Sequence, residues 1–308
     1  MNAPSTGIAR RIGGVVALIA ILLVAYISVI RPGQCRWGAT DAEVARAMPG
    51  DELVADPSLD ATRAITIRGT PDQIWPWLVQ MGFQKAGYYG YDLVENIGSA
   101  RGLRSADTII PELQSLHVGD RVEISAVAWV HVRAIEPNRF ITWGSDDRPA
   151  TGSFLWALEP VDSAHTRLIS RVRLHYVTEF PLILLQGFTE LFDHVAIRRI
   201  LHGVRARVEG DDDRLRSQIL DMTPWALSFG AMIVAMVLMF RRRRWAAAWV
   251  AALAFGGALL FTLYSDADPS TELAVLFVLV PLLVGAWRSD APSGSPRVGT
   301  PSAWLAHR

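Results

Sequence analysis

Residues Met222–Tyr264 have the sequence MTPWALSFGAMIVAMVLMFRRRRWAAAWVAALAFGGALLFTLY. Two apolar runs, 222–240 and 245–264, flank four consecutive arginines. A helix rises about 1.5 Å per residue, so each run is long enough to cross a hydrocarbon core of about 30 Å. One continuous helix would place the arginines in hydrocarbon at roughly 2.5–3.5 kcal/mol each. The sequence therefore predicts a hairpin of two transmembrane helices with Arg241–Arg244 at one membrane surface.

Two further apolar runs extend this pattern. Residues 12–30 follow Arg10 and Arg11, and the shorter run 272–287 contains Pro281 and precedes Arg288. We therefore expect four transmembrane α-helices in a multi-pass protein of the cell membrane. A cleaved signal peptide is the alternative for 12–30. An uncleaved anchor is favoured because this apolar core is long and lacks an Ala-x-Ala-like site.

The arginines also predict an orientation, since basic loops stay on the cytoplasmic side. Residues 1–11 then form a cytoplasmic N-terminus, and 288–308 form a disordered cytoplasmic tail. The segment 37–215 becomes an extracytoplasmic domain. Residues 36–221 carry 20 Lys plus Arg against 26 Asp plus Glu. This acidic balance argues against nucleic-acid binding, which calls for a basic stripe on the folded domain.

Composition and motifs limit the kinds of binding or catalytic site that the chain can form. The single cysteine permits no internal disulfide and leaves no zinc-binding set, so we expect no metal and no cofactor. Walker A, Gly-x-Gly-x-x-Gly, His-Glu-x-x-His and Gly-x-Ser-x-Gly motifs are all missing from the sequence. The only lysine is Lys85, and this arginine-for-lysine bias, with the high alanine content, indicates a bacterium with a GC-rich genome.

Periodicity within 37–215 predicts an α+β domain. A short helix is expected at Ala39–Pro49, and a second begins at Thr70, with Pro71 in its first turn, Gln73 as capping-box partner and Pro76 as a kink or early stop. Helical spacing returns at Leu191–Val208. The predicted strands are Ala61–Arg68, Asp120–Ser125, Val127–Ile135, Phe140–Gly144, Ser153–Glu159 and Thr166–Val177. The simplest architecture is a curved antiparallel sheet that grips the long last helix.

Two-residue alternation in the last strand and helical spacing in the last helix predict which side chains share a face. We expect Arg167, Arg171 and Arg173 on the solvated outer face of the sheet, although contact with an anionic ligand is an alternative. We expect the polar face of the helix to carry a set of basic side chains. These are Arg198, Arg199, Arg205, Arg207, His194 and His202.

Five segments of the domain form a recognisable set: TRAITI at 62–67, IWPWLVQMG at 74–82, GYYGYD at 87–92, VGD at 118–120 and the strand around Arg167–Arg171. Together they resemble the START-like, or SRPBCC, superfamily, in its polyketide cyclase/dehydrase-like and lipid-transport branch. The resemblance covers Trp37 to Glu209. It implies a helix-grip fold with a deep, mostly apolar cavity between the sheet and the long helix, and it implies no particular ligand.

The resemblance also suggests where a ligand would bind, because the stretch after the first long helix lies near the cavity mouth in such folds. Tyrosine and tryptophan provide apolar walls with one polar end, which suits an amphiphile. The predicted ligand-binding residues are Tyr88, Tyr89, Tyr91, Asp92 and Glu95 from that stretch, and Trp129, Trp143 and Trp156 from the sheet. The alternative is that the aromatics are core and the acids are solvated. A general acid or base role for Asp92 or Glu95 lacks a partner base in the sequence.

Three classes of function follow from these expectations. The favoured one is a membrane-anchored domain that binds a hydrophobic or lipid-like small molecule beside the membrane lipids, with no catalysis. The alternatives are a cyclase- or dehydratase-type enzyme acting on a hydrophobic substrate, and a membrane interaction protein with a vestigial cavity. The sequence names no protein partner.

Overall fold

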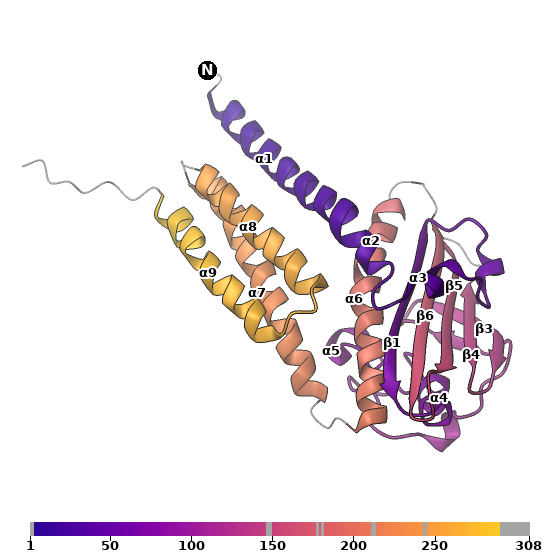
Figure 1. Cartoon of the computed structure of the whole chain (residues 1–308). Helices are drawn as coiled ribbons and strands as arrows, with labels where there is room; N and C mark the ends of the chain where they lie inside the picture. Colours follow the sequence, from indigo (N-terminus) through magenta and orange to yellow (C-terminus); the bar gives the residue numbers. More distant parts are fainter. Residues whose placement is uncertain are drawn as a thin grey trace, which may run out of the picture.

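The computed structural model describes residues 3–145, 150–176, 179, 182–210, 214–242 and 245–289. They form an α+β domain and a bundle of long apolar helices that lies beside it (Figure 1). Most of the predicted tail, 290–308, falls outside the described residues, as do Arg243 and Arg244.

Within the described residues, six strands form one antiparallel sheet in the order β1-β6-β5-β4-β3-β2. The strands are β1 (Leu59–Arg68), β2 (Arg121–Glu123), β3 (Trp129–Glu136), β4 (Phe140–Ser145), β5 (Ala150–Pro160) and β6 (His165–Tyr176). Each includes or falls within a predicted strand, to within a few residues. β1 pairs along its whole length with β6, from Leu59 opposite Leu174 to Arg68 opposite His165. The first strand of the domain is therefore an edge of the sheet beside the last.

Two helices enclose one face of this sheet. Helix α4 (Pro71–Val79) begins with the predicted cap, in which the side chain of Gln73 accepts the backbone N–H of Thr70 at 2.9 Å. It contains Pro76 and ends at Val79, shorter than the apolar pattern to Gly82 suggested. Helix α6 (Leu182–Glu209) is the long last helix. The apolar side chains that α6 contributes to the main core are Ile197, Ile200, Leu201 and Val204.

The opposite face of the sheet is covered, so the prediction of a solvated arginine row was wrong. The short helices α3 (Asp41–Ala45) and η2 (Asp51–Leu53) lie over it. Arg171 is 4% exposed, and its guanidinium contacts the carboxylate of Asp51 at 2.7 Å. Arg167 binds Glu43 at 2.7 Å, and Arg173 lies 3.3 Å from Asp51. Sequence periodicity identified the face but gave no information on what packs against it.

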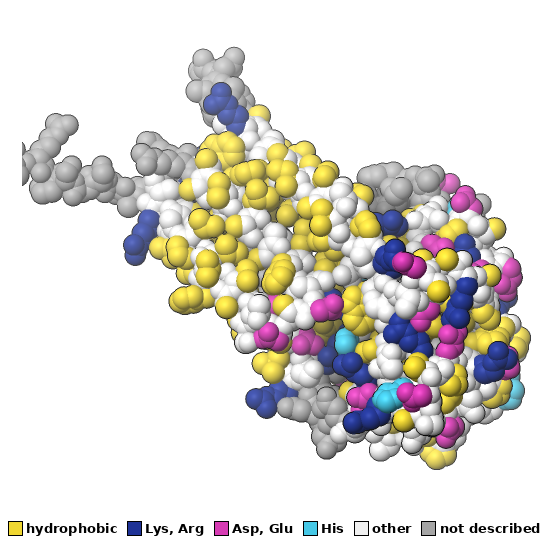
Figure 2. All heavy atoms as spheres, viewed as in Figure 1, with side chains coloured by type: hydrophobic (Ala, Val, Ile, Leu, Met, Phe, Trp, Pro, Cys, Tyr) yellow, Lys and Arg dark blue, Asp and Glu magenta, His cyan; other side chains and the backbone are white. Residues whose placement is uncertain are grey.

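The bundle contains the four predicted apolar runs. Its helices are α1 (Ala3–Ala25), continued by η1 (Tyr26–Ile30) and α2 (Arg31–Gln34), then α7 (Arg214–Arg241), α8 (Trp245–Tyr264) and α9 (Pro269–Arg288). In the described part of the chain, four helical segments are long and apolar enough to cross a membrane. Pro281 lies inside α9 without ending it. Apolar side chains cover most of the visible bundle surface, whereas charged ones gather on the domain (Figure 2).

Small residues allow the bundle helices to approach closely. Ala235, Ala248, Ala251 and Ala252 are fully buried between α1, α7 and α8, as small side chains often are in membrane bundles. At one end, the Arg11 guanidinium donates to the carbonyl oxygen of Arg242 at 3.1 Å. Arg11 near the start of α1 and Arg242 just after α7 therefore lie at the same end of the bundle.

At the other end, the bundle is joined to α6 by buried polar contacts. Glu190 on α6 accepts a bond from the Arg31 guanidinium at 2.5 Å and another from the Tyr26 hydroxyl at 3.1 Å. The Tyr264 hydroxyl donates to the carbonyl oxygen of Leu191 at 3.0 Å. These bonds fix α6 against the ends of α1 and α8 that face the domain.

Candidate ligand-binding cavity

A cavity of about 670 Å³ lies between the concave core face of the sheet and helix α6. Its walls are mostly apolar side chains of β3, β4, β5 and β6 on one side and of α6 on the other. Five of the eight predicted binding residues line it, namely Tyr88, Glu95, Trp129, Trp143 and Trp156. The cavity has the size and the apolar character of sites that hold drug-sized molecules.

Two tryptophans form the inner wall. Trp143 on β4 and Trp156 on β5 are 3% and 2% exposed. Their rings meet edge to face, with centroids 6.1 Å apart. Neither indole N–H has a hydrogen-bond partner among the described residues. They present a rigid aromatic wall that costs little conformational entropy to hold.

Trp129 lies at the opening of the cavity, on the side of strands β2 and β3. It is 39% exposed, and the Arg121 guanidinium lies over its ring, 4.1 Å from the centroid. The neighbouring turn between β2 and β3 exposes Ile124 and Val127, which also line the cavity. The outer part of the cavity is therefore as apolar as its interior.

Tyr88 supports the wall through its ring. Its hydroxyl donates to the carbonyl oxygen of Glu123 at 2.8 Å, which anchors the short strand β2. Burial, reinforced by the nearby carboxylates of Glu95 and Glu123, raises the pKa of Tyr88. The hydroxyl is neutral and already bonded to the protein, so the ring is the part of Tyr88 that a ligand would meet.

Glu95 is the acidic group of the cavity, at the end of the short helix α5 (Asp92–Glu95). Both carboxylate oxygens are buried and lack a hydrogen bond of good geometry within the described structure. Burial raises the pKa of Glu95 to about 7, although the backbone N–H groups of Tyr91 and Gly90 act in the opposite direction. The carboxyl packs against the Cα of Gly90, where a Cβ would overlap it. Near neutral pH this side chain can therefore hold or release a proton inside an apolar site.

The other three predicted residues do not line this cavity. Tyr89 is fully buried, and its hydroxyl donates to the carbonyl oxygen of Trp77 at 3.0 Å. The Tyr91 ring contacts Trp225 of α7, with centroids 6.3 Å apart. The backbone N–H of Asp92 donates to the side chain of Gln218 at 2.9 Å. These residues attach the 88–95 stretch to the helices.

Tyr89 and Tyr91 line a second, polar cleft of about 490 Å³ between α6, α7 and the α8–α9 loop. Burial and the neighbouring arginines lower the pKa of His202 there to about 4. The charged residues around this cleft balance in number. They are Arg198, Arg199, Arg205 and Arg207 against Glu209, Asp221, Asp266 and Glu272. The cleft therefore offers no excess charge of either sign to a ligand.

Two assignments on α6 were wrong. His194 is fully buried and not on a solvated polar face, because it packs between Arg63 and Tyr26 under α1. Arg207 is 6% exposed, and its guanidinium lies over the Tyr89 ring at 4.4 Å and donates to the carbonyl oxygen of Ala106. Both side chains face elements that are distant in sequence, which helical spacing cannot reveal.

Sequence reasoning also missed part of the cavity wall. Gln186, Thr189, Phe192 and Asp193 of α6 line the cavity alongside Ile197 and Ile200. The signal was present, because Gln186, Thr189 and Asp193 share the helical phase of Ile197. Polar residues on a core-facing stripe indicate that the stripe borders something other than packed side chains.

A buried ionic cluster connects this wall to the bundle. The Arg63 guanidinium lies 2.9 Å from the carboxylate of Asp193, and the Tyr176 hydroxyl donates to Glu190 at 2.9 Å. Burial alone would raise the pKa of Glu190, but bonds from His194, Arg31 and Tyr176 lower it to about 2. In the described ranges, no group of three or more His, Cys, Asp or Glu is placed to hold a metal ion.

Neither a model of a known protein family nor a curated protein matches this chain. Among solved structures, it is similar to MLL2253 from Mesorhizobium loti, with 16% identity over 49% of this chain and 98% of that one and a TM-score of 0.28. It is also similar to CalU16 from Micromonospora echinospora, with 11% identity over 70% and 93% and a TM-score of 0.33. A third is TTHA0849 from Thermus thermophilus, with 13% identity over 49% and 97% and a TM-score of 0.31. At these values the likenesses carry no conclusion about ligand or activity.

Proposed function

We propose that this protein is a membrane-anchored binding protein whose START-like domain holds an apolar or amphiphilic small molecule. The observation that carries this proposal is the cavity of about 670 Å³ walled by Trp143 and Trp156. An open cavity of this size with mostly apolar walls gains free energy when an apolar group replaces the water in contact with those walls. The helices keep the domain beside a source of hydrophobic molecules.

A ligand of this kind would place its apolar body against the two tryptophans. Its polar end would lie toward Glu95, which can donate a hydrogen bond when protonated and accept one when ionised. We propose that the chain binds without transforming its ligand and that the domain lies outside the cytoplasmic membrane. The other carboxylate at the cavity wall, Asp193, is paired with Arg63 and is therefore poorly suited to act as a base beside Glu95.

Glu95 also supports a second candidate, a cyclase- or dehydratase-type enzyme. A carboxyl group with a pKa of about 7 in an apolar cavity is suited to general acid or base chemistry near neutral pH. The two proposals differ in what happens to the ligand. Small molecules that co-purify with the protein are extracted and identified by mass spectrometry. The recovered compound is then incubated with the protein and its mass is measured again. An unchanged mass indicates binding alone, and a changed mass indicates conversion.

Binding itself is tested with dansylated undecanoic acid and the full chain in nanodiscs, read as energy transfer from protein tryptophans to the dansyl group. Ala196→Trp places a large ring in the cavity and should abolish the signal. Ala206→Trp makes the same change on the same helix, but at the polar cleft, and should leave the signal unchanged. Thermal melting of both variants checks folding. Equal signals from the two variants would refute binding in this cavity and would favour the interaction-protein alternative.

A further inference from the structure

Part of the cavity mouth lies at the end of the bundle that faces the domain. Arg31 and Tyr26 bind Glu190, Tyr264 binds the backbone of Leu191, and Tyr91 packs on Trp225. In Figure 1 the first turns of α6 lie beside α2, where the bundle ends. Tyrosine and tryptophan at the ends of spanning helices mark the headgroup level of a bilayer. The third turn of α6 and the segment around α5 are thereby held at that level.

This part of the molecule exposes large apolar side chains. On α6, Phe188 and Phe192 are 57% and 51% exposed, and their rings lie one helical turn apart with centroids at 4.6 Å. Across the mouth, Val94 and Ile97 are 43% and 64% exposed. Phe192 and Val94 also line the cavity. The apolar surface is thus continuous from the cavity wall to these exposed side chains.

We propose that this rim (Leu93, Val94, Ile97, Phe188 and Phe192) rests in the bilayer that the helices cross, and that a lipid acyl chain enters the cavity sideways from that leaflet. This inference rests on the proposed function and names its ligand class. Several exposed aromatic and aliphatic side chains at headgroup level gain free energy by burial in the acyl boundary. A chain that passes between Phe192 and Val94 stays in contact with apolar groups throughout and never crosses water.

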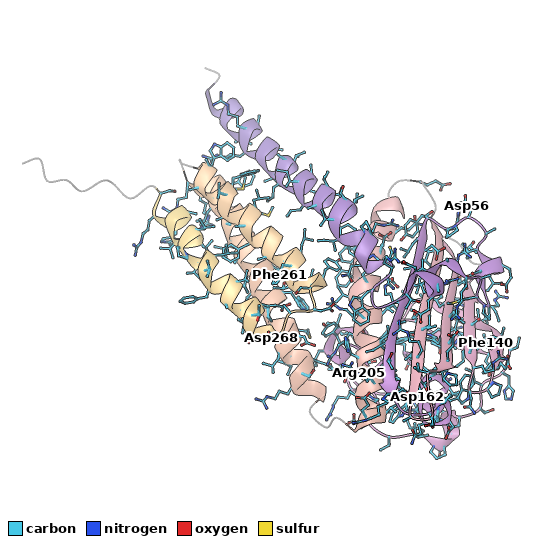
Figure 3. The ribbon with its side chains drawn as sticks, viewed as in Figure 1. Asp56, Phe140, Asp162, Arg205, Phe261 and Asp268 are labelled. Atoms are coloured by element: carbon cyan, nitrogen blue, oxygen red, sulfur yellow. The ribbon has the colours of Figure 1, made fainter. Side chains whose placement is uncertain are left out.

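The proposed contact between the rim and the bilayer is tested with a fluorescent label attached at the rim. In a Cys35→Ser background, Phe188→Cys carries an environment-sensitive fluorophore, and Val161→Cys is the matched control. Val161 is 60% exposed and adjoins Asp162, which lies at the end of the domain away from the bundle (Figure 3). The protein is reconstituted in phosphatidylcholine–phosphatidylglycerol vesicles. Doxyl-labelled lipid should quench the label at position 188 and iodide should not, with the opposite result at position 161.

The route is tested by uptake. Phe188 does not line the cavity, so Phe188→Asp alters the rim and leaves the binding space unchanged. Uptake of a pyrene-labelled fatty acid from the vesicles should slow by roughly tenfold or more in Phe188→Asp, and little in Phe188→Leu.

Equal iodide quenching at positions 188 and 161, or equal uptake by Phe188→Asp and the unaltered protein, would overturn the proposal. A failure of the proposed function has a different signature. The unaltered protein would then give no dansyl signal, while the label at position 188 would still be quenched by doxyl lipid.

Discussion

Glu95→Gln removes the ionisable group from the cavity and keeps its shape. Burial raises the pKa of Glu95 from about 4.5 in the unfolded chain to about 7 in the folded one. The folded protein therefore binds this proton more tightly, and the resulting stability is fully present below pH 4.5. It is lost as the pH rises through 7, because the unfolded state has already released its proton without cost. A difference of two to three pKa units corresponds to roughly 3 kcal/mol.

The variant should thus be more stable than the unaltered protein at pH 8 and about equal to it at pH 5. For a domain of this size, 3 kcal/mol corresponds to a shift in melting temperature of roughly 6–12 °C. Tryptophan fluorescence melts of the full chain in nanodiscs at both pH values measure it, and Glu112→Gln, which changes an exposed carboxylate, is the control. A constant offset between Glu95→Gln and the unaltered protein at both pH values would refute the reasoning. It would mean that the carboxylate is solvated or paired.

Four further outcomes are expected. Dansylated undecanoic acid should bind more weakly as the pH rises through 7, because ionised Glu95 repels its carboxylate, and titrations of Glu95→Gln should lack this dependence. Trp143→Ala should weaken the same binding by roughly tenfold or more, whereas Tyr91→Ala, in the other cleft, should not change it. Arg171→Ala removes the closer of the two guanidinium partners of Asp51 and leaves the buried backbone carbonyl oxygen of Glu43 without its donor. It should lower the free energy of unfolding by roughly 3–5 kcal/mol in denaturant titrations. Arg139→Ala, whose pair with Glu136 is exposed, should cost less than about 1 kcal/mol. Alkaline phosphatase fused after Ser163 should be active and a fluorescent protein fused after Arg308 bright, and a silent phosphatase would reverse the proposed topology.

The α+β order and the apolar helices were predictable because each depends on local pattern. Two-residue alternation in 166–177 and a three- to four-residue period in 191–208 specify a strand and a helix whatever surrounds them. The Thr70–Gln73 cap was predictable for the same reason, since both partners lie within one turn.

The candidate site was predictable only in part. Trp143 and Trp156 were predicted as aromatic residues on strands of the sheet, and both line the cavity. Tyr89 was assigned to the cavity from its neighbours in sequence, but its positive φ of 66° turns the chain there. Gly203 allows the close approach of that backbone to α6, where a Cβ would overlap the Tyr89 carbonyl oxygen. The Tyr89 side chain therefore packs against Trp77 and under the Arg207 guanidinium and does not line the cavity.

The sequence by itself determined which segments are apolar enough to cross a membrane and which end of each carries the arginines. Length, hydropathy and charge are additive along a chain, so no contact needs to be known to evaluate them. Only the tertiary structure decided that Asp51 covers Arg171, 120 residues away, that Glu190 binds Arg31 across 159 residues, and that Glu95 is buried beside a cavity. The energy of a charge depends on the dielectric and the partners around it, and the fold brings those from distant parts of the chain.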